Sequence, residues 1–201
     1  MNRIACIAAL LVVFAASACS AGDEDVKIAL HVLAHNAKQT CANLPSIVGC
    51  GDFVTTYSDC DDVDVFAVFF DFDGLTYTEH GLTWPVEWGS ATTTQCGLLS
   101  IGDIMDPGDV IAIAWSECQP GPTKISAWTW LSPNGPGAID PVPRPATGSL
   151  PSFLGITDCE FVEIQVICAF GAGVCGIYGD DPCGPSAAEA TYWGAIKAMF
   201  R

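Results

Sequence analysis

The chain has 201 residues, with 23 Asp and Glu against 7 Lys and Arg, a formal charge of −16, and half of its residues are hydrophobic. So acidic a chain repels phosphate backbones, which excludes nucleic-acid binding, and its hydrophobic content excludes an intrinsically disordered acidic protein. The length suits one domain that buries its own core. Composition therefore places the chain among globular proteins without revealing an activity.

The first segment has the three parts of a secretory signal peptide. A basic start at Met1–Arg3 precedes an apolar run over residues 4–16, and small residues follow. The run is too short to span a bilayer, and no second run of membrane length exists. We therefore expect residues 1–21 to be a leader and the protein to be periplasmic, cell-surface or extracellular. A lipid anchor at Cys19 is the alternative, which we do not favour because Ala16 replaces the usual large aliphatic residue.

Nine cysteines remain beyond the leader, and an oxidising compartment makes disulfides the expected state. They are Cys41, Cys50, Cys60, Cys96, Cys118, Cys159, Cys168, Cys175 and Cys183. Four bridges would leave one odd thiol. Cys96 and Cys118 bracket a strand pair, Cys175 and Cys183 bracket a turn, and two of the first three are expected to close a loop. Each closed loop would add roughly 2–4 kcal/mol, while the connectivity stays open. The absence of any C-x-x-C pair argues against structural zinc and thiol redox chemistry.

Alternating apolar residues over 26–35 predict a strand, although Ala and Leu also suit a helix. On a strand, His31 and His35 lie roughly 13 Å apart, too far to share a metal ion, and we interpret them as surface residues. Residues 36–62 are expected to form loops.

The apolar run over 63–72 predicts a central strand buried on both faces. Further strands are expected over 75–84, 110–115 and 124–131. The last of these alternates, with one face formed by Ile125, Ala127, Thr129 and Leu131 and the other by Trp128 and Trp130.

The proline- and glycine-rich stretch 132–151 predicts an extended loop, and 161–169 predicts another strand. The tail 186–201 has apolar residues at helical spacing after Ser186, a candidate cap. The order of short strands and turns therefore predicts an all-β protein. We expect an antiparallel β-sandwich over residues 22–185 with disulfide-supported loops, followed by a short C-terminal helix.

Three segments resemble bacterial exported β-sandwich modules of the cohesin and carbohydrate-binding type. They are the strand Val65–Phe70, the aromatic-proline turn Gly81–Pro85 and the Pro-Gly turn into a strand at Asp106–Ile113. The chain is also similar to uncharacterised cysteine-containing secreted bacterial proteins. The resemblance covers about a third of the chain and implies a fold class without site residues. The cysteines depart from ordinary cohesins.

Catalytic motifs are missing, because the sequence has neither a G-x-S-x-G turn nor an H-E-x-x-H motif. No catalytic residue is identified, and an exported hydrolase stays an alternative. Calcium is the one cofactor considered, because hard carboxylate oxygens cluster before the central strand. The candidate ligands are Asp59, Asp61, Asp62 and Asp64. A solvated acidic loop explains the same residues and is favoured.

Trp128 and Trp130 face the same way on the predicted strand, roughly 7 Å apart, which is a spacing suited to stacking on sugar units. Rings that fill the core are the favoured interpretation. The leading hypothesis is a non-enzymatic secreted or surface-associated module with a structural, adhesive or assembly role and another surface protein as partner. A glycan-binding module is the alternative.

Overall fold

The computed structural model describes residues 26–89 and 91–183. The expected leader over residues 1–21 and the expected C-terminal helix over residues 186–201 lie outside the described residues. No helix in the described part of the chain is long and apolar enough to cross a membrane.

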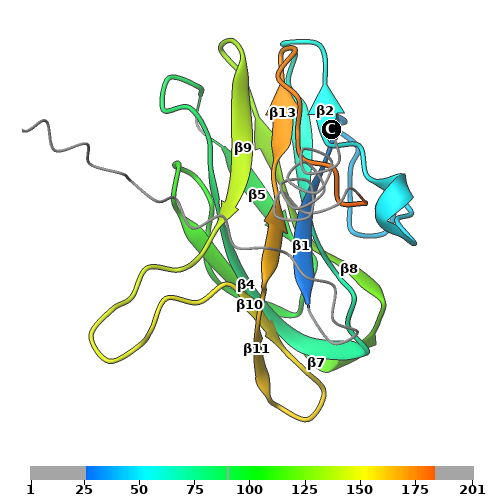
Figure 1. Cartoon of the computed structure of the whole chain (residues 1–201), viewed down its shortest axis with the longest axis vertical. Helices are drawn as coiled ribbons and strands as arrows, with labels where there is room; N and C mark the ends of the chain where they lie inside the picture. The colour runs from blue at the N-terminus through cyan, green and yellow to red at the C-terminus, as the bar shows by residue number, and fades with distance from the viewer. Residues whose placement is uncertain (1–25, 90, 184–201) are drawn as a thin grey trace, which may run out of the picture. The chain divides into compact units, whose positions relative to one another are not determined.

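The first sheet has five strands and contains the elements with the strongest apolar patterns (Figure 1). Neighbours run antiparallel, except that the edge strand β12 runs parallel to β1. The alternation that favoured a strand over a helix near the N-terminus is confirmed, because β1 pairs with β3 along its full length. The spatial order is β12 (Cys168–Phe170), β1 (Lys27–Ala34), β3 (Val63–Phe70), β8 (Thr123–Leu131) and β5 (Thr92–Gln95).

The second sheet has eight strands and branches at β4 (Gly74–Thr83). One edge of β4 pairs with β7, whose other edge pairs with β6. The opposite edge of β4 pairs first with β10 and then with β9, and each of these carries further strands. These strands are β6 (Leu99–Gly102), β7 (Val110–Pro120), β10 (Gly155–Thr157), β11 (Glu163–Gln165), β9 (Gly137–Val142), β13 (Ala172–Val174) and β2 (Thr56–Tyr57).

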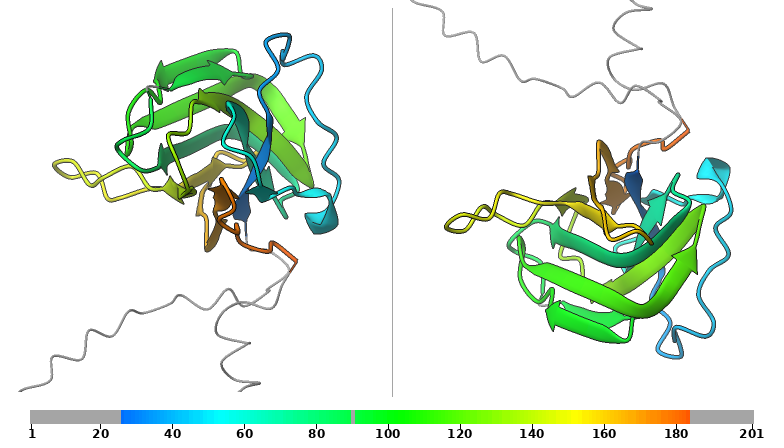
Figure 2. Two further views of the ribbon diagram at one scale, coloured as in Figure 1. Left: turned by 90° about the horizontal axis from the view of Figure 1, so that it is seen from above. Right: turned by 90° about the horizontal axis from the view of Figure 1, so that it is seen from below.

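The two sheets enclose a hydrophobic core, so the predicted β-sandwich is confirmed for the described residues (Figure 2). Strand residues that point inward are fully buried, such as Ile28 and Val65 from the first sheet and Leu75 and Ile113 from the second. Burial of these side chains from both layers is the main source of stability in such an architecture.

A second, smaller core lies on the outer face of the five-stranded sheet. Phe66, Val68 and Trp128 point outward there and pack against Ile47 from the loop between β1 and β2. This loop includes a short 3-10 helix, η1 (Cys50–Asp52). The loop between β1 and β2 covers the outer face of β3, so all residues of that strand are buried. This confirms the prediction of a central strand buried on both faces.

A β-bulge in β8 corrects the predicted alternation of that strand. Ala67 of β3 pairs with Ala127, whereas the next residue, Val68, pairs with Ile125, which leaves Ser126 without a partner position. The extra residue reverses the facing of everything before it. Ile125 therefore joins the outer core with Trp128 instead of facing the main core with Ala127.

Two other segments differ from expectation. The stretch 132–151 contains a strand, β9, which changes partner midway: Gly137–Ile139 pairs with β13 and Asp140–Val142 with β4. Each half is paired on one side, and this arrangement tolerates a proline at position 141.

The single strand expected over 161–169 is two short strands in different sheets. β11 belongs to the eight-stranded sheet and β12 to the five-stranded sheet. The chain crosses between them at Val166 and Ile167, whose amide groups donate to Leu154 O and Val26 O.

The disulfides join distant parts of the chain, contrary to the local loops expected from the sequence. They link Cys41 to Cys96, Cys50 to Cys183, Cys60 to Cys175 and Cys118 to Cys159. Cys168 is disulfide-bonded as well. The expectation of one odd thiol is therefore wrong for the described residues. Sequence spacing failed because the packing of distant loops, and not a local turn, brings the partners together. Disulfides of this number indicate folding in an oxidising compartment.

Candidate functional site

The edge strand β6 and the residues beside it expose an unusual amount of apolar side chain. Leu98, Leu99 and Ile101 are 72%, 59% and 71% exposed, and Met105 is 52% exposed. Leu99 and Ile101 stand two positions apart and pair with Ala114 and Ala112 of β7, so they share the outer face of the sheet. We call Leu98, Leu99, Ile101 and Met105 the β6 surface. Exposed apolar residues gathered in this way mark interaction sites more often than isolated ones do.

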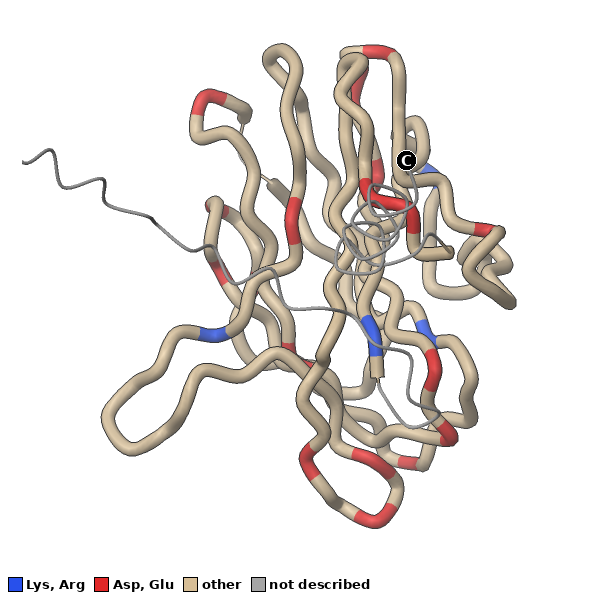
Figure 3. The backbone as a smooth tube through the Cα atoms, in the orientation of Figure 1, with Lys and Arg blue, Asp and Glu red and all other residues tan. Residues whose placement is uncertain are grey.

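The sequence on either side of β6 carries negative charge alone. Residues 86–123 contain no Lys or Arg, and their acidic residues are Glu87, Asp103, Asp106, Asp109 and Glu117. Figure 3 shows that acidic residues greatly outnumber basic ones on the unit as a whole. Proteins commonly protect an edge strand with lysine, and this edge has none.

The loop after β6 is held in shape by one of these carboxylates. Asp109 Oδ2 accepts hydrogen bonds from the backbone N–H groups of Asp106 and Met105, at 2.9 and 3.2 Å. Met105 is thereby held beside the edge strand, and its carbonyl oxygen accepts a hydrogen bond from the Ala91 N–H. The β6 surface is therefore built on a strand and an ordered turn.

A polar network occupies the middle of the same sheet face. Glu79 of β4 accepts a hydrogen bond from the Tyr77 hydroxyl at 3.0 Å and an ion-paired hydrogen bond from Arg144 Nε at 2.6 Å. Burial and the adjacent Glu79 carboxylate raise the pKa of Tyr77. Arg144 reaches this point from a hairpin in which it pairs with Phe153. The hairpin therefore covers the face near β10 and leaves the β6 and β7 side open.

The two tryptophans proposed as a sugar platform have different environments. Trp128 is 6% exposed and lies in the outer core beneath the loop between β1 and β2. Trp130 is 39% exposed, and its ring stacks on His35 with centroids 4.8 Å apart. Burial of Trp128 agrees with the favoured interpretation that the rings fill a core, although this core lies beneath the covering loop and not between the sheets.

Of the two histidines predicted to lie on the surface, His31 is buried and His35 is partly exposed. His31 is 4% exposed and its Nδ1 accepts the Val54 N–H at 3.0 Å. Burial lowers the pKa of His31. His35 pairs through Nδ1 with the buried Asp64 at 2.8 Å. No described Ser, Thr or Cys side chain hydrogen-bonds to either ring or to His80, so no nucleophile accompanies them.

The structure does not gather the four candidate calcium ligands into one site. Asp64 binds His35 and the Asn36 N–H, and Asp62 Oδ1 accepts the Ser132 hydroxyl at 2.6 Å. Asp59 and Asp61 are exposed. Within residues 26–89 and 91–183, no group of three or more His, Cys, Asp or Glu is placed to hold a metal ion.

The β6 surface was not singled out from the sequence. Its signal is present, since Leu99 and Ile101 alternate in a stretch without basic residues, but four residues are too few for periodicity to define a strand.

Comparisons with known proteins leave the family open. No protein-family description and no curated protein sequence match the chain. A type II cohesin domain from the cellulosome of Acetivibrio cellulolyticus has a similar structure, with a TM-score of 0.49 and 8% sequence identity. The likeness covers 75% of this chain and 95% of that domain. It is a likeness of strand arrangement alone.

Proposed function

We propose that the chain is a non-enzymatic exported module that binds a protein partner through the β6 surface. The observation that carries this proposal is the gathering of exposed apolar side chains on an edge strand whose flanking sequence, over residues 86–123, has no basic residue. Leaving such side chains in water is unfavourable, and an unprotected edge invites unwanted pairing. A partner that covers them accounts for both features.

The charge of the surroundings defines the partner. Because the charged residues in the sequence on either side of β6 are all acidic, a complementary protein presents apolar side chains bordered by Lys or Arg. Export fits this role, since the disulfides require an oxidising compartment and the N-terminal segment has the pattern of a leader. The role is then adhesion or assembly outside the cytoplasm, with no catalytic step.

Photo-crosslinking tests the proposal whatever the identity of the partner. A benzophenone amino acid is placed at position 99 or 101, with position 150 as control, because Leu150 is also exposed but lies in the distant hairpin. The protein is then irradiated in the exported fraction of its own host. We expect one discrete product from positions 99 and 101 and none from position 150.

Charge substitutions at Ile101 sharpen the test. Ile101→Lys removes the apolar contact and adds repulsion toward a basic partner, whereas Ile101→Asp removes the same contact and adds attraction. We expect the lysine variant to lose crosslinking at position 99 by roughly 30-fold or more, and the aspartate variant to lose less. Equal crosslinking from positions 99 and 150, or an unaffected Ile101→Lys variant, would refute the proposal.

A further inference from the structure

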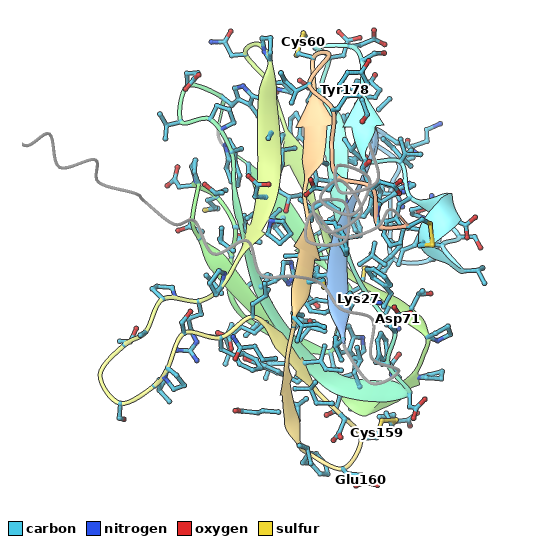
Figure 4. The ribbon with its side chains drawn as sticks, in the orientation of Figure 1. Lys27, Cys60, Asp71, Cys159, Glu160 and Tyr178 are labelled. Atoms are coloured by element: carbon cyan, nitrogen blue, oxygen red, sulfur yellow. A yellow bond between two sulfur atoms is a disulfide. The ribbon has the colours of Figure 1, made fainter. Side chains whose placement is uncertain are left out.

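The turn between β8 and β9 carries the one Asn-Gly pair in the sequence. Residues 132–136 read Ser-Pro-Asn-Gly-Pro, and Asn134 is exposed. The two prolines have no backbone N–H to donate, so they cannot contribute ladder hydrogen bonds to this turn. Figures 1 and 4 show the turn at the upper end of β9, at the same end of the sandwich as the labelled Cys60.

The turn is anchored at both ends and open in the middle. On one side, the Ser132 hydroxyl donates a hydrogen bond to Asp62 Oδ1 at 2.6 Å. On the other side, Gly137 begins β9 so close to the Trp88 ring that an added Cβ would stand 2.5 Å from it. Between these anchors Gly135 has a φ of 117°, and apart from its chain neighbours no atom lies within 4 Å of an added Cβ. The central pair can therefore reorient without disturbing either anchor.

Two other asparagines lie among the described residues, and the carboxamides of both are held in place. Asn36 Oδ1 accepts the Lys38 N–H at 3.0 Å, inside a turn that the Gln39 N–H closes on the Asn36 carbonyl oxygen. Asn43 Oδ1 accepts the Thr40 N–H at 2.6 Å, and Asn43 Nδ2 donates to the Lys38 carbonyl oxygen. Local hydrogen bonds of this kind fix the direction in which an asparagine side chain points.

At Asn134 both groups of a ring closure are free. Within the described residues no hydrogen bond holds its carboxamide or the Gly135 N–H. A following glycine has no side chain to keep its nitrogen away from the carboxamide carbon, and it adopts the backbone angles that the approach requires. We propose that Asn134 is a site of spontaneous deamidation, through a succinimide formed with Gly135.

The reaction needs water as its one co-reactant. Hydroxide takes the proton of the Gly135 N–H, and the nitrogen attacks Cγ of Asn134. The bond from Cγ to Nδ2 breaks, and Nδ2 leaves as ammonia with a proton from water, which restores the hydroxide. A water molecule then opens the succinimide at either of its carbonyl carbons, which leaves aspartate or isoaspartate at position 134.

The product changes the surface and spares the core. An amide becomes a carboxylate, which adds one negative charge to a formal charge of −16. Isoaspartate also lengthens the backbone by one carbon, but the centre of the turn is open and both anchors lie outside it. The folded protein is therefore expected to accumulate the product without unfolding. The modification is separate from the β6 surface.

Peptide mapping by mass spectrometry tests the proposal on the purified folded protein, incubated at mildly acidic, neutral and alkaline pH. We expect the peptide that contains Asn134 to exchange its amide for a hydroxyl and to yield aspartate and isoaspartate forms. In isotopically heavy water each product should gain one heavy oxygen. The conversion should accelerate as pH rises, because base generates the attacking nitrogen. The peptides that contain Asn36 and Asn43 should keep their amides over the same period.

Two substitutions at exposed positions serve as matched controls. Asn134→Gln should give no product, because its longer side chain must close a larger ring. Ala37→Gly creates a second Asn-Gly pair, but there the carboxamide of Asn36 is held by the Lys38 N–H. In the folded variant we expect Asn36 to react roughly tenfold or more slowly than Asn134, since the side-chain bond and the turn bond must first break. In urea, where these bonds are lost, the two pairs should react at similar rates.

The comparison of folded and unfolded protein is decisive. A folded wild type that keeps its amide at Asn134, while the chain in urea loses it, would overturn the proposal. Equal rates at Asn36 and Asn134 in folded Ala37→Gly would overturn it as well, because the open turn would then confer nothing beyond the sequence pair.

Discussion

His80 on β4 is a buried imidazole that the fold requires to be uncharged. Its side chain is 1% exposed, and neither ring nitrogen has a hydrogen-bond partner among the described residues. The ring meets Phe69 edge-on, with centroids 5.8 Å apart. Burial lowers the pKa of His80 to about 4. A proton on this ring would place a charge in the main core without any group to stabilise it.

The effect on stability follows from the difference between the folded and unfolded pKa values. In the unfolded chain the imidazole has a pKa of about 6.5, so between pH 6.5 and pH 4 the unfolded state binds a proton that the folded state does not. The free energy of unfolding therefore falls as pH is lowered through this window and is unaffected above it. At about 1.36 kcal/mol per unit, the loss is about 1.4 kcal/mol at pH 5.5 and about 2.5 kcal/mol at pH 4.5.

Urea unfolding of the wild type and of His80→Leu, followed by tryptophan fluorescence, measures this loss. Carboxylates titrate in both proteins and cancel in the difference. We expect His80→Leu to gain about 2.5 kcal/mol relative to the wild type between about pH 7.5 and pH 4.5. Thr78→Val is the matched control, because Thr78 is a fully buried residue of the same strand whose hydroxyl lacks a partner and does not titrate.

The difference between Thr78→Val and the wild type should therefore be independent of pH. If the difference between His80→Leu and the wild type is equally constant down to pH 4.5, the ring is not buried and unpartnered as described, and the reasoning fails. His80→Phe provides a second apolar replacement should the leucine variant not fold.

Other substitutions test the outer core and the disulfides. Trp128→Ala should cost about 3–5 kcal/mol in urea unfolding because its ring is buried, whereas Trp130→Ala should cost less than about 1 kcal/mol; similar losses would contradict the covered outer face. Cys60→Ser with Cys175→Ser opens the loop of about 20 residues that this bond closes together with the Cys50–Cys183 bond, so unfolding should need about 3 kcal/mol less under non-reducing conditions. A loss below about 1 kcal/mol would argue against this pairing.

Local patterns predicted the strands because a strand's side chains alternate independently of distant partners. The apolar run beginning at Val63 became β3, and the turn before Val110 led into β7. The pattern failed at Ser126, since a bulge depends on how β8 meets β3 and leaves no composition signal. It failed at β9 because each half of that strand is supported by a different neighbour.

The candidate sites depended on contacts that sequence spacing does not encode. Trp128 and Trp130 were correctly placed on the same strand face, yet only the path of the loop between β1 and β2 determines that one ring is covered and the other is not.

The disulfide between Cys41 and Cys96 bears on which sheet is open to a partner. Cys96 directly follows β5, the edge strand of the five-stranded sheet, so the bond fastens the covering loop across that sheet's outer face. The side chains on the two outer faces differ accordingly. The covered face of the five-stranded sheet presents large apolar groups such as Phe66, whereas β7 presents the small side chains of Ala112 and Ala114 on its partly exposed face. A partner that binds a sheet face therefore meets the eight-stranded sheet, where the exposed edge is β6.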